Sequence, residues 1–141
     1  MAIRTYQGVA YPAQCDAMGH MNVQYYIAAF DQSLWHLVAA CGYRQEWIAQ
    51  KHEGWADVRY EIDFRNELPV GHLFVVDAEV VRIGRSSMVT RHVMRHQGEE
   101  TIAAELLATS VYFDLAARKA HAIPDVVRDG ATGLLAEAPA A

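Results

Sequence analysis

The chain has 141 residues, a length that fits one domain, and its 52% hydrophobic and 21% charged residues are typical of a folded globular protein. Twelve Lys and Arg against seventeen Asp and Glu give a formal net charge of -5. This charge disfavours nucleic-acid binding, because no overall positive field would attract a phosphate backbone. No apolar run reaches the length of a membrane span, and the first residues lack the pattern of a secretion signal, so we expect a cytoplasmic protein that does not enter the membrane.

The first predicted element is a strand over 4–11, where β-forming residues accumulate before Pro12 ends the run. A loop follows over 15–22, because its turn residues show no period. Asn22 closes this loop and is a good N-cap for a helix. The sequence therefore predicts a strand, a loop and a helix start in that order.

The strongest pattern is a helix over 23–41. Its apolar residues recur at the three- and four-residue spacing of one helix face, at positions 23, 26, 27, 30, 34, 37, 38 and 41. Gly42 suits the left-handed conformation that ends many helices. Further apolar residues lie outside this face, so we expect the helix to be enclosed by the rest of the chain.

Four β-rich runs follow the helix, over 56–65, 72–82, 86–96 and 101–113. Short turns between them favour an antiparallel meander, and together with the first strand they predict an α+β fold with a five-stranded sheet curled around the helix. The segment 43–52 is interpreted as a short helix or linker. We expect the domain to occupy 1–124, and 125–141 to form a short turn and then a frayed tail.

The loop and the helix start carry a recognisable motif. Residues 16–26, Asp-Ala-Met-Gly-His-Met-Asn-Val-Gln-Tyr-Tyr, resemble the D-x-x-G-H-x-N-x-x-Y motif of hotdog-fold acyl-CoA thioesterases of the 4-hydroxybenzoyl-CoA thioesterase type. The runs Leu-Pro-Val-Gly at 68–71 and Arg-Ile-Gly-Arg-Ser-Ser at 82–87 match weaker landmarks. The resemblance covers about 4–124 and implies a hotdog fold, in which a curved antiparallel sheet wraps a long central helix.

The resemblance implies that Asp16 is the catalytic carboxylate. A thioester needs a nucleophile at its carbonyl, whereas its thiolate leaves without strong protonation, so one carboxylate can suffice. Attack by Asp16 on the carbonyl and activation of a water by Asp16 remain open. The free N–H groups at the helix N-terminus suit the oxyanion, first at Val23, with Gln24 or Gly19 as alternatives.

The residues of this loop also have possible structural roles beside the functional ones. Asp16 and Gly19 also suit an ordinary self-capped turn. His20 is assigned a supporting role, bonding the substrate or Asp16, although a lone loop histidine is more often structural. Asn22 holds the donors in place as the N-cap.

Three further residue types are candidates for a chemical role. Asp31 interrupts the apolar helix face and is either a second catalytic acid or a carboxylate bonded to its neighbours. Cys15 is more simply a small buried residue than a nucleophile. Seven scattered His show no ligand spacing, so we expect no metal.

The resemblance also places coenzyme A and a second subunit. Arg82, Arg85 and Ser86 flank a turn and are candidates for holding the phosphates of coenzyme A, with Arg59 and Arg91 as weaker candidates. No cofactor is expected beyond the coenzyme A of the substrate. The family's obligatory dimers imply a homodimer, and a dimer of dimers, a homotetramer, is the further expectation.

The expected function is hydrolysis of a small or aromatic acyl-CoA to the free acid and CoA. Three Trp and seven Tyr also suit a betainyl group through cation–π contacts. The alternatives are a hotdog hydratase or dehydratase, in which His20 and Asp31 would move a proton, and a non-catalytic acyl-CoA-binding module. The sequence leaves open the acyl group, the pathway, and whether an acyl carrier protein replaces coenzyme A.

Overall fold

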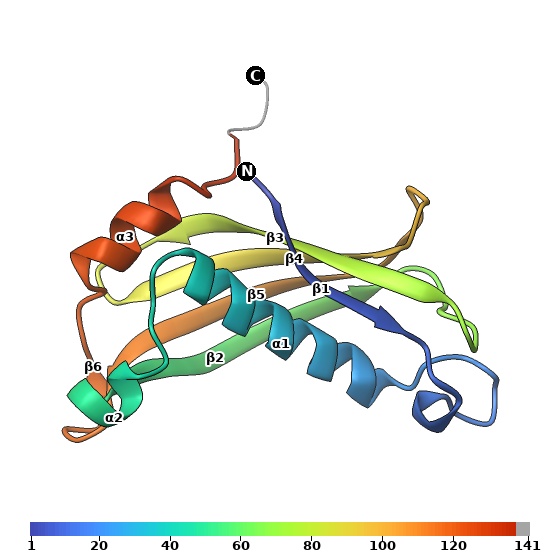
Figure 1. Cartoon of the computed structure of the whole chain (residues 1–141), viewed down its shortest axis with the longest axis horizontal. Coiled ribbons are helices and arrows are strands. Elements are labelled where there is room, and N and C mark those ends of the chain that lie inside the picture. Colours follow the sequence, from blue (N-terminus) through green and yellow to red (C-terminus); the bar gives the residue numbers. More distant parts are fainter. Residues whose placement is uncertain (138–141) are drawn as a thin grey trace.

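A computed structural model describes residues 1–137 of the chain (Figure 1). The elements in order are β1 (Ile3–Val9), the one-turn helix η1 (Pro12–Gln14), α1 (Val23–Ala40), α2 (Trp47–Lys51), β2 (Glu53–Phe64), β3 (Leu73–Ile83), β4 (Ser87–His96), β5 (Ile102–Asp114), β6 (Lys119–Ala120) and α3 (Asp125–Thr132). The α+β class, the long helix and the curled antiparallel sheet are confirmed, and the short α2 fills the segment predicted as a helix or linker. No helix within these residues is long and apolar enough to cross a bilayer.

The sheet has the order β1-β3-β4-β5-β2, and the two-residue β6 adds to β5. The predicted meander holds for β3, β4 and β5 but is wrong for β2, which pairs with β5 from Glu53 opposite Asp114 to Phe64 opposite Ala104. The reason is the connection after β2, which is no tight turn: its Leu68 carbonyl accepts the N–H of Met21 at 2.9 Å, so the chain is drawn to the loop before α1. Strand β2 is left at the sheet edge.

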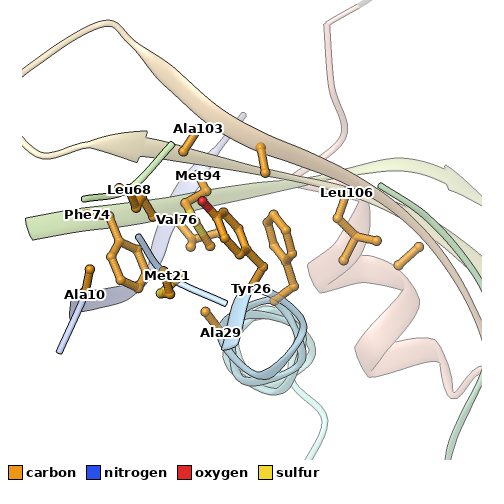
Figure 2. Packing of buried hydrophobic residues seen from close by; sticks show 13 residues of the cluster. Ala10, Met21, Tyr26, Ala29, Leu68, Phe74, Val76, Met94, Ala103 and Leu106 are labelled. Atoms are coloured by element: carbon orange, nitrogen blue, oxygen red, sulfur yellow. The ribbon is translucent and has the colours of Figure 1, made fainter. Parts of the chain in front are cut away.

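Helix α1 packs one face against the inner side of the sheet. Its cap is the Asn22 side chain, which accepts the Gln24 N–H. Figure 2 shows Tyr26 and Ala29 pointing from α1 toward Val76 and Met94 on the sheet. The opposite face leaves apolar side chains exposed, among them Val23, Ile27 and Trp35. The predicted enclosure is therefore wrong for a single chain, because the sheet curls over one side of α1 only.

A chain of buried polar side chains ties α1 to two strands. Ser33 Oγ lies 2.6 Å from both Thr5 Oγ1 on β1 and His92 Nδ1 on β4. His92 Nε2 in turn lies 2.9 Å from Thr90 Oγ1. Burial lowers the pKa of His92 to about 4, so the ring is held neutral in the core.

After Pro124, where a short turn and then a frayed tail are predicted, the structure forms the helix α3 instead. Val127 and Ala131 of α3 are fully buried, and Gly130 lies so close to the Cys41 carbonyl that a Cβ there would sit 1.9 Å from its oxygen. The backbone beyond α3 then bonds to Val80 of β3. Val127 and Ala131 form a single pair at the four-residue helical spacing, and one pair is too short a pattern to predict a helix from the sequence. Part of the predicted tail, 138–141, lies outside the described residues.

Candidate active site

The loop before α1 closes on itself around Asp16. Gly19 adopts a φ of 86°, a left-handed conformation that glycine takes without strain, and its N–H donates to the Asp16 carbonyl at 3.0 Å. Asp16 Oδ1 accepts the Met18 N–H at 2.9 Å. Its other carboxylate oxygen has no protein partner within residues 1–137. The self-capped turn is thus real, and it leaves one oxygen of a half-buried carboxylate available for chemistry.

This loop is fixed to the connection that follows β2. The Val70 N–H donates to the Gly19 carbonyl at 3.1 Å, and the Met21 N–H donates to the Leu68 carbonyl at 2.9 Å. The run at 68–71, noted in the sequence as a weaker landmark, therefore supports the loop directly. Its role could not be read from the sequence, because the two segments lie about fifty residues apart.

Hydrogen bonding narrows the choice of oxyanion donor at the start of α1. The Gln24 N–H is taken by Asn22 Oδ1 at 3.2 Å, and the Tyr25 N–H by the Asn22 carbonyl at 3.0 Å. The Gly19 N–H is occupied as well. The Val23 N–H has no acceptor in the described chain, so Val23 is the donor that this geometry leaves for a ligand.

A cavity of about 580 Å³ brings most of these groups together. It is lined by Asp16, His20, Asn22 and Val23 from the predicted set, and by Tyr26 and Phe64. Nε2 of His20 lies 3.9 Å from Glu67 Oε1, so Glu67, and not Asp16, is its protein partner. Sequence reasoning missed Phe64 and Glu67, because neither belongs to the motif and only the fold places the end of β2 beside it.

The candidates for binding coenzyme A lie at the β3–β4 turn, at the opposite end of the sheet from the loop before α1 (Figure 1). Arg82 and Arg85 are exposed and make no ion pair with any described residue. Arg128 of α3, which sequence reasoning missed, donates through Nη2 to the carbonyls of Gly84 at 2.9 Å and Arg85 at 3.1 Å. Ser86 contributes its carbonyl to the Tyr112 N–H at 2.7 Å. A single subunit therefore does not bring the predicted catalytic residues and the predicted coenzyme A-binding residues together.

The remaining candidates have structural partners or lie elsewhere. Arg59 pairs with Glu61 and Arg91 with Glu79, which weakens both as phosphate ligands. Cys15 is half-buried, with Sγ 3.8 Å from the Ala10 carbonyl oxygen.

Asp31 lines two other cavities on the α1–β2 side. Partial burial and then the nearby Asp57 raise the pKa of Asp31. Within one subunit His20 and Asp31 line different cavities, so a single chain does not form the pair that proton transfer at carbon would need.

Residues 11–130 match the family model described as the thioesterase-like superfamily. No curated protein sequence matches the chain.

Solved structures share the fold at low sequence identity. A 1,4-dihydroxy-2-naphthoyl-CoA thioesterase from Synechocystis is 14% identical, with a TM-score of 0.82 over 95% of this chain and 98% of that one. A Staphylococcus aureus protein in complex with CoA is 11% identical, with a TM-score of 0.88 over 100% and 91% of the two chains. A predicted thioesterase from Bacillus stearothermophilus is 17% identical, with a TM-score of 0.84 over 98% and 99%.

Proposed function

Because the chain belongs to the thioesterase-like superfamily, we propose that it hydrolyses an acyl-CoA to the free acid and CoA at the cavity that contains Asp16. Family membership makes the chain a thioester hydrolase, and the predicted hotdog fold and family resemblance are confirmed. The identity of the thioester and the roles of single residues form the proposal.

One observation carries this proposal: a carboxylate oxygen of Asp16 and the N–H of Val23, neither with a protein partner in the part of the chain that the structure describes, border the same cavity. In the proposed reaction Asp16 either attacks the thioester carbonyl or takes a proton from an attacking water. The Val23 N–H, at the positive end of α1, stabilises the oxyanion. The leaving thiolate departs as an anion, because the pKa of its thiol is about 8.5.

A homodimer is proposed as the active form, because the loop of Asp16 and the arginine-bearing β3–β4 turn lie at opposite ends of one subunit. The edge strand β2 leaves backbone groups free for a second copy. Exposed apolar side chains flank that edge on α1 and β2, among them Ile27, Val58 and Phe64. Antiparallel pairing of β2 with β2 of a second copy reverses one subunit relative to the other. The arginine-bearing turn of each subunit would then lie at the same end as its partner's Asp16.

Coenzyme A binding is proposed at that turn, through the cationic side chains of Arg82 and Arg85, with Arg128 holding the turn and Ser86 beside them. The similar Staphylococcus aureus structure, solved with CoA, supports coenzyme A as the carrier. The proposal requires no metal and no cofactor of its own. A cytoplasmic location and assembly of dimers into tetramers stay predictions.

The acyl group is proposed to be small or aromatic, with a betainyl group among the candidates. The similarity to a naphthoyl-CoA thioesterase supports including aromatic acyl-CoAs among the substrates to be tested. Within one subunit the separate positions of His20 and Asp31 do not support a hydratase. A non-catalytic acyl-CoA-binding module would not need a free carboxylate oxygen on Asp16, so the free oxygen favours an enzyme.

A panel of short, branched, aromatic and cationic acyl-CoAs tests the proposed reaction. Thiol release and hydration of an enoyl-CoA are followed separately on the same protein. We expect thiol release from at least one acyl-CoA and no hydration. Hydration without thiol release, or tight acyl-CoA binding without either reaction, would overturn the proposal.

A further inference from the structure

A second cavity lies at the opposite end of α1 from Asp16. It has a volume of about 350 Å³ and is lined on α1 by Asp31 and Trp35 and on β2 by Trp55 and Asp57, with Tyr43 between them. None of these residues contributes to the cavity around Asp16. The proposed chemistry of thioester cleavage leaves this second cavity without a role.

Neither carboxylate of this cavity forms an ion pair among residues 1–137, although Arg59, which pairs with Glu61, lines a neighbouring cavity with both of them. Asp57 accepts hydrogen bonds from Ser110 Oγ at 2.9 Å and from the Tyr60 hydroxyl at 3.3 Å, both uncharged donors. Asp31 has no hydrogen-bond or ion-pair partner among residues 1–137. Within the described part of the chain, no Lys or Arg lines this cavity. Asp31 is half-buried and Asp57 is exposed, and two acids that border one space without an ion-pair partner favour a cationic occupant.

Aromatic rings form the rest of the wall. Trp55 lies edge-on to Tyr43, with ring centroids 6.1 Å apart. Trp35 projects from α1 and is half exposed in a single chain. Aromatic faces combined with carboxylates match the recognition of a quaternary ammonium, which binds through cation–π contacts and cannot donate a hydrogen bond.

An apolar acyl group fits this cavity less well. An apolar group would displace water from the half-buried Asp31 without replacing its interactions, which costs free energy. A small metal ion would not need the aromatic walls, since hard cations bind oxygen ligands. A short acyl group that ends in a cation uses both kinds of side chain.

Strand β2 relates the second cavity to Asp16. Gly54, Trp55 and Asp57 from its first half line the second cavity, whereas Phe64 from its end lines the cavity of Asp16. Within one subunit the two cavities are separated along α1 by about twelve residues, or ~18 Å. In an antiparallel β2–β2 pair, the first half of one strand lies against the second half of the other. The second cavity of each subunit then adjoins the partner's Asp16.

We propose that the cavity of Asp31, Trp35 and Trp55 in one subunit holds the acyl end of a thioester that the partner's Asp16 cleaves, and that this acyl group is short and carries a quaternary ammonium. The proposal rests on the proposed thioesterase function and on its dimer. It names the substrate class and assigns Asp31 as a specificity-determining residue.

The first test compares two thioesters of the same shape. (Trimethylammonio)acetyl-CoA and 3,3-dimethylbutanoyl-CoA differ in the replacement of N⁺ by carbon. Because N⁺ also withdraws electrons from the thioester carbonyl, each kcat/KM is divided by the rate constant of uncatalysed hydrolysis of the same thioester. A cation–π and carboxylate preference of roughly 1.4 kcal/mol predicts that this ratio is at least about tenfold higher for the cationic substrate. Equal or faster hydrolysis of the neutral substrate would overturn the assignment while leaving the thioesterase function intact.

Asp31→Asn removes the charge with little change in volume. We expect this variant to lose at least about tenfold more kcat/KM on the cationic thioester than on the neutral one. Asp129→Asn is the matched control, since Asp129 is exposed on α3 and lines neither this cavity nor that of Asp16. An equal loss on both substrates in Asp31→Asn would contradict a role in recognising charge.

Mixing two variants tests whether the site is shared between subunits. Dimers of Asp16→Asn and of Asp31→Asn each lack one half of both sites, but a mixed dimer has one complete site if the halves come from different subunits. After exchange in a 1:1 mixture, we expect about a quarter of the wild-type rate on the cationic substrate. A rate that stays at the mean of the two variants would overturn the shared arrangement.

A binding measurement separates this proposal from the proposed hydrolysis. Tetramethylammonium is titrated while tryptophan fluorescence is followed, with tert-butanol as the neutral probe. We expect saturable quenching by the cation that weakens about tenfold in Asp31→Asn. Binding without hydrolysis of any thioester would reject the proposed function and keep the cation site. Absence of saturable binding would reject the site.

Discussion

The residues around Asp16 could be predicted from the sequence because they are contiguous. One motif carries the carboxylate, the turn glycine, the cap and the first residue of α1, and local hydrogen bonds arrange all of them. Arg128 and Glu67 could not be predicted in the same way. Arg128 reaches the β3–β4 turn from α3 and Glu67 reaches His20 from the connection after β2, so both contacts exist only after the chain has folded.

Val23 allows a test of the oxyanion donor that a side-chain change cannot give. Proline is tolerated at the first position of a helix, and Asn22 before it already has an extended backbone, with φ of -74° and ψ of 149°. Val23→Pro therefore removes the free N–H and keeps the helix. We expect kcat to fall by about 10²–10³ with little change in unfolding temperature.

Val23→Ala is the matched control for this change, because it removes the exposed side chain and keeps the N–H. It is expected to retain most of the activity. If Val23→Pro folded and turned over at the rate of Val23→Ala, another group would have to bind the oxyanion.

At the scale of elements, periodicity identified α1 and the long strands, but not how they connect or end. Strand β2 was placed beside β3 because short connections favour neighbours, yet its connection instead supports the loop of Asp16. Helix α3 is predicted from the sequence only as a short turn, because only Val127 and Ala131 face the core. The positions of β2 and α3 depend on tertiary contacts that the local sequence does not encode.

Gly130 tests whether α3 is docked on α1. Gly130→Ala would place a Cβ 1.9 Å from the Cys41 carbonyl oxygen, so the helices must separate. We expect the free energy of unfolding to fall by roughly 1–3 kcal/mol, measured by urea denaturation. Gly133→Ala is the control, because its Cβ would meet Gly130 at an ordinary 3.5 Å. Equal stability of the two variants would contradict the docked helix.

At the scale of the whole molecule, the fold leaves one face of α1 and the edge of β2 without a partner in a single chain. The predicted dimer covers both. Val58 lies on this edge and is 60% exposed, so Val58→Lys is expected to shift sedimentation toward the monomer and to lower activity with it. Val126→Lys, at an exposed valine on α3, should leave the dimer intact. A dimer that survives Val58→Lys with full activity would contradict pairing through β2.

The buried network around His92 predicts how stability depends on pH. The pKa of His92 falls from 6.5 to about 4 on folding, so between these values the unfolded state binds more protons. The stabilisation is complete above pH ~6.5 and is lost as pH falls toward ~4, in total about 3 kcal/mol.

The difference between wild type and His92→Gln isolates this effect, since other ionisable groups are shared. Between pH 7 and pH 5, wild type should lose about 2 kcal/mol more of its free energy of unfolding than the variant. Urea denaturation at both pH values measures the difference. Parallel pH profiles would show that His92 is not held neutral by the fold.

The central claim, that Asp16 is the carboxylate that cleaves a thioester, is tested most directly by thiol release from the best acyl-CoA with wild type and Asp16→Asn. The asparagine oxygen can still accept the Met18 N–H that now bonds Asp16 Oδ1, so the loop should persist. The account predicts a loss of at least about 10² in kcat at unchanged unfolding temperature, with Asp129→Asn, at an exposed position on α3, as the control. Retention of more than roughly a tenth of the wild-type kcat by folded Asp16→Asn would contradict it.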